Sequence, residues 1–393
     1  MKVLVSGAGV AGPALAWWLV RYGAEVTIVE RAQELRTGGY VVDFWGAGFE
    51  IADRMGLIPE IRRKGYMVRE VRVVGRDGRR VSGFPVEAFA RIAQNRYTSV
   101  PRGDLSQIIF RDVEPKIETL FGDTIEKLEQ DANGVTVQLA RGGERRFDII
   151  IGADGLHSNV RRLIFGPDDR FEVYLGFKVA AFSVQGYRPR EELVYLMYTE
   201  VGQQVNRFSM RDDRTMFLFT FADRDPAFPQ NIDEQKALLR RRFGGSGWES
   251  GAILDALDQA PELYFDRVSQ IRMPAEEWCA GGRVALVGDA ASCVSLLAGE
   301  GSGLAIVAAY ILAGELHRAG GDYQRAFVRY RDLFRPFVAE KQRAALRFAR
   351  SFAPPSKLSI VMRNAFFRLM AIGWIADLLA GRGLRDDIVL PEY

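Results

Sequence analysis

Three glycines near the start of the chain, Gly7, Gly9 and Gly12, could hold a phosphate group. They stand directly after a β-prone run and directly before an apolar helical segment, with Val10 and Ala11 between them. In this spacing the first glycine permits a tight turn, the second lets the backbone approach a pyrophosphate, and the third lets helix and strand pack closely. Phosphates would lie at the positive end of the helix dipole. The pattern predicts a dinucleotide site; an ordinary glycine-rich turn is the alternative.

A carboxylate completes the same unit. Glu30 ends a second β-prone run, Glu25–Val29, roughly 20 residues after the glycines, where an acid can hydrogen-bond ribose hydroxyls and repel a 2′-phosphate. Arg31 follows and is included in the predicted site. Because the unit begins at Lys2, we expect no signal or transit peptide before it.

Two more carboxylates occupy a comparable position. Asp154 and Asp289 follow the β-prone runs Phe147–Ile151 and Arg283–Val287, and small residues and a helix come after each. This order places backbone amides and a carboxylate at the ligand edge of a sheet. Asp289 in such a position suits the hydroxyl groups of a polyol.

The helix beyond Asp289 begins in a second glycine-lined segment, residues 298–303, and extends to about Leu316. Its first amides would face an anionic or electron-rich group, while a glycine cluster that serves only helix packing is the alternative. The predicted ligands in this segment are Gly299, Gly301, Ser302 and Gly303.

Two other features are candidate cofactor ligands. Arg102 precedes an expected helix, Asp104–Val113, where it would hold a phosphate or simply decorate the helix start. Gly38 and Gly39 precede a β-prone run, so the backbone would approach something flat or bulky there, or form a plain turn. We keep Arg102 and Gly39 as candidates.

The elements that position these residues belong to a chain of 393 residues, enough for two or three domains. A net charge of +3 with dispersed basic residues gives a nucleic-acid role no support. Two cysteines and two histidines build neither a disulfide framework nor a zinc site, which favours the reducing cytoplasm and leaves little room for nucleophilic catalysis. Any hard chemistry is therefore expected to belong to a cofactor.

The remaining pattern predicts an α/β fold with a second domain. A β-meander is expected over 123–151, and the aromatic strand-like runs of 171–273 predict a mixed sheet that is joined by a hairpin over 70–84. One face of this sheet would line a substrate cavity, although an aromatic stripe is more often sheet core. The candidate substrate-lining residues are Tyr195, Met197, Phe208, Phe217, Phe219 and Leu296.

The C-terminal part, 323–393, is predicted to be helical. Apolar residues are frequent over 358–379, but Arg363, Arg368 and Asp377 make this stretch too polar to span a membrane. A docking helix, or at most an interfacial one, is expected instead. No metal site is expected, and no catalytic base can be singled out.

Four landmarks in this order resemble the class A flavoprotein monooxygenases. This para-hydroxybenzoate hydroxylase-like family includes the aromatic-polyketide hydroxylases and the tetracycline-inactivating monooxygenases. The landmarks are GAGVAG at 7–12, Arg102, GADGLHSNVR at 152–161, and GDAA with AGEGSG at 288–303. They cover most of the chain, and the last two together are far more specific than the first.

The resemblance implies roles for individual residues. The first motif and Glu30 would hold the ADP part of FAD, and Arg102 would contact the central portion of the cofactor. Asp154 would serve both FAD and NAD(P)H binding, Asp289 would bind the ribityl chain, and 298–303 would lie by the isoalloxazine ring.

The resemblance also implies an architecture. A Rossmann-like FAD-binding domain of the GR2 type with a β-meander is expected, together with a mixed-sheet substrate domain and a C-terminal helical segment. The expected boundaries are 1–69, 98–170 and 275–322 for the FAD-binding domain, 70–97 and 171–274 for the substrate domain, and 323–393 for the helical region.

The reaction follows from the family as well. NADPH or NADH reduces FAD, O₂ adds to give a C4a-hydroperoxide, and its terminal oxygen is transferred to an electron-rich aromatic or enolic carbon. This implies hydroxylation of an aromatic or polyketide-like small molecule, which includes antibiotic modification, by a monomer or homodimer. The chain has no second GxGxxG unit, which fits a family without a separate nicotinamide-binding domain.

Two positions depart from the family pattern. Ser292 stands where the family usually has His, and Leu296 where it usually has a proline that shapes the wall over the reactive face. Leu296 is compatible with a different substrate shape or with a member that inserts no oxygen. Two alternatives to the hydroxylase stay open: a reductase or dehydrogenase of the prenyl-reductase type, and a non-catalytic flavin-binding protein. A quinone-biosynthesis hydroxylase that works at a membrane is a variant of the hydroxylase interpretation.

Overall fold

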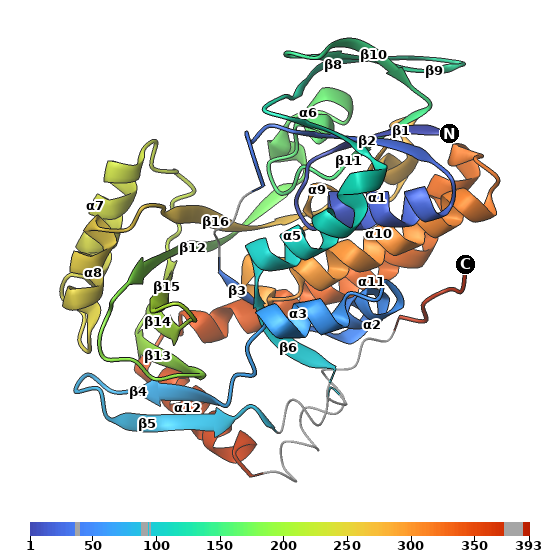
Figure 1. Ribbon diagram of the computed structural model, residues 1–393. Helices are drawn as coiled ribbons and strands as arrows, with labels where there is room; N and C mark the ends of the chain where they lie inside the picture. Colours follow the sequence, from blue (N-terminus) through green and yellow to red (C-terminus); the bar gives the residue numbers. More distant parts are fainter. Residues whose placement is uncertain (36–39, 88–92, 94–95, 373–387) are drawn as a thin grey trace.

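The computed structural model describes residues 1–35, 40–87, 93, 96–372 and 388–393 (Figure 1). Its first unit is β1 (Lys2–Ser6), α1 (Ala11–Arg21) and β2 (Glu25–Glu30), and the two strands pair in parallel. Apolar residues in the middle of β1 and β2 are almost fully buried, as expected for strands that are covered on both faces.

Five strands form one parallel sheet in the order β17-β11-β1-β2-β7. The other three are β7 (Glu118–Phe121), β11 (Ile149–Gly152) and β17 (Val284–Leu286). Because every pairing is parallel, the carboxyl ends of β1, β11 and β17 lie at one edge of the sheet. The glycine turn and the two strand-terminal aspartates of the sequence analysis follow these three strands.

Helices and a short ribbon surround the parallel sheet. The long helix α10 packs against α1 and α2, and α5 packs against α1. The ribbon is β3 (Val41–Trp45) paired antiparallel with β6 (Tyr97–Pro101). The helices are α2 (Gly46–Arg54), α3 (Ile58–Lys64), α5 (Arg102–Val113), α6 (Asn159–Ile164), α9 (Asp289–Ser292) and α10 (Gly301–Arg318).

A separate antiparallel sheet of three strands lies at one end of the molecule (Figure 1). It consists of β8 (Ile125–Asp131), β9 (Gly134–Leu139) and β10 (Gly143–Phe147). The predicted meander is thus present, but its third strand is β10, and residues 149–152 belong to the parallel sheet instead. The prediction failed there because β10, with the sequence GERRF, is polar and largely exposed, so no alternation marked it as a strand.

The second large sheet has seven strands in the order β16-β12-β15-β14-β13-β4-β5. As predicted, the hairpin of β4 and β5 joins it, because β4 pairs in parallel with β13. Helices α7 (Ile232–Phe243) and α8 (Ser250–Asp258) lie against one face of the sheet (Figure 1). The strands are β4 (Glu70–Val74), β5 (Arg80–Pro85), β12 (Glu172–Gln185), β13 (Val194–Glu200), β14 (Gln203–Ser209), β15 (Arg214–Ala222) and β16 (Tyr264–Ile271).

Two helices follow α10. The 30-residue helix α11 (Tyr323–Phe352) packs along α10, and α12 (Lys357–Met370) packs on β5 at the end of the molecule opposite the meander (Figure 1). Residues 388–393 return to α10, where the Tyr393 hydroxyl donates to Glu315 Oε1 at 2.8 Å. Within the described part of the chain, no helix is both long and apolar enough to cross a membrane.

Candidate functional site

The glycine turn after β1 has the close contacts that its spacing predicts. Gly7 has φ of +109°, and a Cβ there would lie 2.6 Å from the Ala153 carbonyl oxygen. A Cβ on Gly12 would lie 1.9 Å from the Gly7 carbonyl oxygen, so helix and turn can approach only without a side chain. At Gly9 the nearest described atom to such a Cβ is Arg102 Nη2, at 3.8 Å, and no other atom of the described residues lies within 4 Å. A side chain at position 9 would therefore fill the space that a phosphate needs.

Helix α1 begins directly at this turn. Val10 is its N-cap residue and Ala11 its first helical residue, and no side chain caps the first turn. Because no capping side chain uses them, the backbone N–H groups in the first turn of α1 are available to hydrogen-bond a ligand.

Glu30 lies beside the turn, at the end of β2. Its carboxylate accepts hydrogen bonds from the backbone N–H groups of Ala8, at 2.8 Å, and Ala32, at 2.9 Å. These bonds fix the carboxylate next to the glycine turn, and a carboxylate retains further lone pairs for ribose hydroxyls. Arg31, the next residue, is exposed. Gly39 lies outside the described residues.

The Asp154 carboxylate accepts hydrogen bonds from the loop that follows it. The donors are the N–H groups of Asn159 and Val160, at 2.8 and 3.1 Å, and the Ser158 hydroxyl at 2.5 Å. Burial raises the pKa of Asp154, and these bonds oppose that rise. The carboxylate is engaged by its own chain, so the residue fixes the loop after β11 rather than offering a free ligand.

The same loop contacts the seven-stranded sheet through one of the two histidines. His157 Nε2 lies 3.3 Å from Asp266 Oδ1 on β16. This hydrogen bond raises the pKa of His157 above its ordinary value, although burial opposes the rise.

Arg102 and Asp289 lie in one partly exposed region with two tyrosines, Tyr40 and Tyr264. Burial raises the pKa of Tyr40 to about 12, while the Arg102 charge lowers it and the Asp289 charge raises it. Burial likewise raises the pKa of Asp289, and Arg102 lowers it. The rings of Tyr40 and Tyr264 lie 5.7 Å apart. Within the described residues neither Arg102 nor Asp289 forms an ion pair, so both charges remain available to a ligand.

The start of α10 completes this space. Gly299 has φ of +70°, and a Cβ there would have no atom within 4 Å, while a Cβ on Gly301 would lie 3.7 Å from Asp289 Oδ1. Ser302 is partly exposed in the first turn. The N-cap residue Glu300 does not cap the helix with its side chain, which instead pairs with Lys341 at 3.2 Å. The N-terminal amides of α10 therefore face the same region as Asp289.

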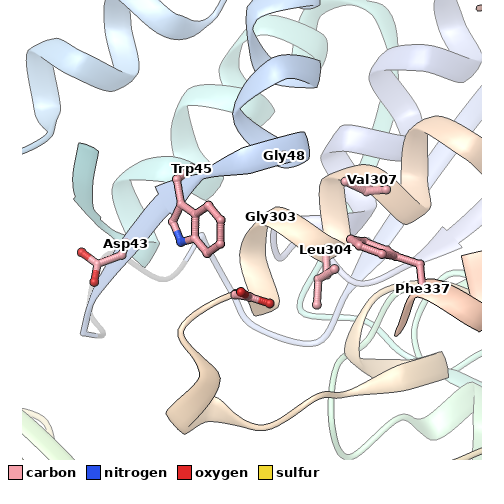
Figure 2. Close-up of a pocket in the computed structure, with 8 residues that line it drawn as sticks. Asp43, Trp45, Gly48, Gly303, Leu304, Val307 and Phe337 are labelled. Carbon is pink, nitrogen blue, oxygen red and sulfur yellow. The ribbon is translucent and has the colours of Figure 1, made fainter. Parts of the chain in front are cut away.

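Two pockets flank this helix start. One is a small hollow between β3, α2, α10 and α11, as Figure 2 shows. The other is smaller and is lined in part by Asp289, Ser292 and Gly301. The first is lined by Asp43, Trp45, Gly48, Glu300, Gly303, Leu304, Val307 and Phe337.

Five residues of this region were not predicted from the sequence: Tyr40, Asp43, Trp45, Gly48 and Tyr264. The only signal for the first four was the β-prone run after the glycine pair, which indicated a close backbone approach without naming side chains. Tyr264 lies on a strand far along the chain, and only its position in the fold brings it to Tyr40.

One face of the seven-stranded sheet points toward this site and is called the inner face. Tyr195 pairs with Phe208, and Met197 lies two residues along β13, so these predicted residues share that face. Leu218 of the same face packs in one cluster with Leu296. Leu296 therefore connects the loop before α10 to the sheet.

Phe217 and Phe219 do not belong to this face. They are fully buried in a cluster with Phe243 of α7 and Leu257 of α8, on the outer face of the sheet. Their proposed contact with a substrate is therefore wrong, and they are sheet core, as the alternative interpretation held. Alternation along a strand shows which residues share a face but not what that face meets.

The donor set fits FAD. Gly9 leaves an open cradle beside an uncapped helix start. Among the described residues, Arg102 offers a cation without an ion pair, and Asp289 offers an acceptor without a cation partner next to the α10 amides. A pyrophosphate requires donors and positive charge, and a ribityl chain requires a hydrogen-bond acceptor for its hydroxyls.

The sequence pattern of the FAD binding domain family matches residues 1–321, and the chain belongs to this family. A flavin-dependent monooxygenase from Legionella longbeachae is 34% identical over 397 residues and covers 100% of this chain and 98% of its own. An uncharacterized Mycobacterium tuberculosis protein is 39% identical over 353 residues, covering 86% of this chain and 91% of that protein. The crystal structure of tetracycline destructase Tet(55) is 33% identical with a TM-score of 0.84, covering 100% and 98% of the two chains.

These likenesses confirm the predicted fold class and the predicted resemblance to the class A flavoprotein monooxygenases. The protein is an FAD-dependent monooxygenase.

Proposed function

We propose that the enzyme uses NAD(P)H and O₂ to hydroxylate an aromatic or polyketide-like small molecule, a class that includes antibiotics of the tetracycline kind. One observation carries this proposal. Leu218 on the inner face of the seven-stranded sheet packs in one cluster with Leu296 and Leu297, which immediately precede the α10 helix start. A molecule bound on the inner face would therefore lie next to the segment assigned to the flavin ring. The tetracycline destructase likeness supports the substrate class.

Each element of the candidate site would hold one part of FAD. The turn over 7–12 and the start of α1 would receive the pyrophosphate, and Glu30 the adenosine ribose. Arg102 would neutralise phosphate charge, and Asp289 would accept hydrogen bonds from the ribityl hydroxyls. FAD, once bound, supplies hydride acceptance from NAD(P)H and the activation of O₂.

The protein itself would position the reacting groups, stabilise the charge that develops on them and exclude water. The amides at the start of α10 would stabilise negative charge that develops at the flavin ring edge, because they lie at the positive end of a helix dipole. The apolar cluster around Leu218 and Leu297 would exclude water from the reacting groups. Burial raises the pKa values of Tyr40 and Tyr264, so both phenols stay protonated at neutral pH and can donate hydrogen bonds.

We also propose the division of the chain that the sequence predicts. Residues 1–69, 98–170 and 275–322 would form the FAD-binding domain, 70–97 and 171–274 the substrate domain, and 323–393 the helical region. The strand pairings support this division, because β4, β5 and β12 to β16 form one sheet and β1, β2, β7, β11 and β17 another. We propose a cytoplasmic monomer or homodimer.

The test begins with an absorption spectrum of the purified protein. We expect a flavin spectrum that bleaches on anaerobic addition of NADPH or NADH and recovers in air. Phenolic and tetracycline-type compounds are then screened for stimulated NAD(P)H consumption, with the product mass as the deciding measurement. A gain of one oxygen supports the proposal, and a change of hydrogens alone indicates the reductase type. A colourless protein that rejects added FAD contradicts the site.

A further inference from the structure

A buried cation without a carboxylate partner lies above the inner face. Arg363 of α12 is 8% exposed, and its guanidinium donates only to neutral acceptors. Within the described residues no acid pairs with it. Its acceptors are Gln204 Oε1 and Thr199 Oγ1, each at 3.0 Å, the Ser351 carbonyl oxygen at 2.9 Å and Asn364 Oδ1 at 3.3 Å. Burial lowers the pKa of Arg363 to about 10, and within the described part of the chain no neighbouring charge opposes this shift. A buried cation of this kind is costly unless a counter-ion reaches it.

Side-chain amides on the same face also lack partners. Asn206 is 1% exposed, and neither its Oδ1 nor its Nδ2 has a hydrogen-bond partner among the described residues. The Tyr195 phenol lies near Asn206, whose side chain opposes the rise that burial causes in the pKa of Tyr195. Gln204, also 1% exposed, uses its Oε1, but within the described part of the chain its Nε2 has no acceptor and the Thr220 hydroxyl has no partner. Proteins rarely leave such groups unpaired, and each one needs an explanation.

These groups form one connected array. Gln204 and Asn206 are two residues apart on β14 and therefore point to the same side of the sheet. Thr220 is opposite Gln204, and Leu218 is opposite Asn206. Leu218 in turn packs with Leu297 before α10. The array thus begins at Arg363 and ends beside the segment assigned to the flavin.

We propose that Arg363 is the counter-ion for an anionic oxygen of the substrate, and that Asn206 and Gln204 hydrogen-bond the same polar edge. The substrate class is an aromatic or enolic compound with a carboxylate, phenolate or enolate group. The anionic oxygen of the substrate would be the charge partner that Arg363 lacks among the described residues, and the Asn206 amide offers both a donor and an acceptor. This inference rests on the proposed function, because it assigns the inner face to the substrate of that reaction.

The structure offers a matched pair of arginines for a test. Arg368 lies five positions after Arg363 on α12, is exposed, and among the described residues donates to the Val81 carbonyl oxygen alone. Arg363→Gln and Arg368→Gln therefore remove the same charge from the same helix. Arg363→Lys keeps the charge and loses the planar fork. Thermal unfolding and circular dichroism of each variant establish that it is folded at the temperature used.

The probes are 3-hydroxy-2-naphthoate and its neutral counterpart 3-hydroxy-2-naphthamide, titrated calorimetrically into the FAD-loaded enzyme at pH 7.5. We expect the wild type and Arg368→Gln to bind the anion at least about tenfold more tightly than the amide, a difference of about 1.4 kcal/mol. Arg363→Gln should lose that preference, and Arg363→Lys should recover part of it. Asn206→Ala should weaken the binding of both probes.

Three results would overturn the inference. They are a wild type that binds both probes equally, an Arg363→Gln enzyme that keeps the anion preference at a lowered melting temperature, and equal losses in the two glutamine variants. The second result would show that Arg363 only holds α12 to the sheet. Calorimetry needs no turnover, so an anion preference without any oxygenated product would contradict the proposed function and leave this site standing.

Discussion

Asp154 and Asp289 both follow strands of the parallel sheet, yet the protein uses them differently. The Asp154 carboxylate accepts three hydrogen bonds from residues 158–160. Asp289 lies against the α10 start with no ion pair among the described residues. The same residue type after the same element thus sets a loop in one place and remains open to a ligand in the other.

We predict that Asp289→Ala weakens FAD binding by about tenfold to a hundredfold, because a hydrogen bond to a charged group contributes about 1.5–3 kcal/mol. Titration of the apoprotein with FAD, followed by flavin fluorescence, measures this. Asp258→Ala is the control, since Asp258 is 59% exposed and pairs with Arg240 on the distant α7. An Asp289→Ala protein with wild-type affinity would remove Asp289 from the site.

We predict that His157 titrates above its ordinary pKa of about 6.5, because Asp266 accepts a hydrogen bond from the imidazolium. Since the folded pKa is raised, the contribution to stability is complete below about pH 6.5 and is lost as the pH rises through the folded value. The side chain is 43% exposed, so the effect is at most a few tenths of a kcal/mol.

Two measurements check this prediction. An NMR titration resolves two imidazoles, and His157→Gln identifies the signal, leaving His317 as the reference. Urea unfolding at pH 6 and pH 8 should show the wild type losing its small advantage over His157→Gln at the higher pH. A His157 pKa at or below the ordinary value would contradict the pairing.

Among the elements, α2 and α10 meet at two glycines. A Cβ on Gly48 would lie 2.5 Å from Gly303 Cα, so the backbones of the two helices approach each other directly. This contact places Trp45, at the end of β3, against the pocket beside the α10 start. The pocket thus depends on how closely two helices pack.

We predict that Gly48→Ala destabilises the protein by about 1–3 kcal/mol, because a backbone atom cannot yield as a flexible side chain can. It should also weaken FAD retention. Gly251→Ala on α8 is the matched control: no atom lies within 4 Å of the new methyl group, and the change should be neutral or stabilise by about 0.4–1 kcal/mol. Thermal unfolding compares the two. Equal melting temperatures would show that the helices separate without cost.

The sequence predicted elements where turn residues and periodicity agree. The hairpin over 70–84 appears as β4 and β5, and the expected helix over 104–113 begins two residues earlier, at Arg102. The sequence pattern did not predict β10, because its polar residues do not alternate with apolar ones, and it did not indicate α8. Parallel pairing of β4 with β13 is a tertiary event that no local pattern specifies.

The site was predictable to a similar degree. Glycines and strand-terminal acids have positions that backbone geometry dictates, so Gly7, Gly12 and Asp289 could be named in advance. Side chains that line a cavity depend on which face of a sheet meets which neighbour. Phe217 was therefore misplaced, and Arg363 was seen only as a residue too polar for a membrane helix.

At the scale of the whole molecule, the segment 388–393 packs against α10. Glu315, 2% exposed, accepts from the Tyr393 hydroxyl and pairs with Arg318, and the Tyr393 ring occupies the space beside Gly314. The last residues of the chain thus contact the helix whose other end belongs to the candidate site.

We predict that Tyr393→Ala lowers the free energy of unfolding by about 2–4 kcal/mol, since it removes a packed ring and leaves Glu315 without one donor. Tyr393→Phe keeps the ring and should cost about 1–1.5 kcal/mol. Urea denaturation of the two variants separates packing from hydrogen bonding. Wild-type stability in Tyr393→Ala would mean that the tail does not hold α10.

The parallel pairing of β4 with β13 has a consequence for synthesis on the ribosome. Glu70 of β4 pairs with Val194, so about 120 residues separate the partners. At roughly 5–20 residues per second, β4 emerges about 6–24 seconds before β13, the strand that pairs with its open edge. During that interval the open edge of β4 can pair with another nascent chain. We therefore expect a lower growth temperature or an added chaperone to raise the yield of soluble protein more than substitutions that stabilise the folded state would.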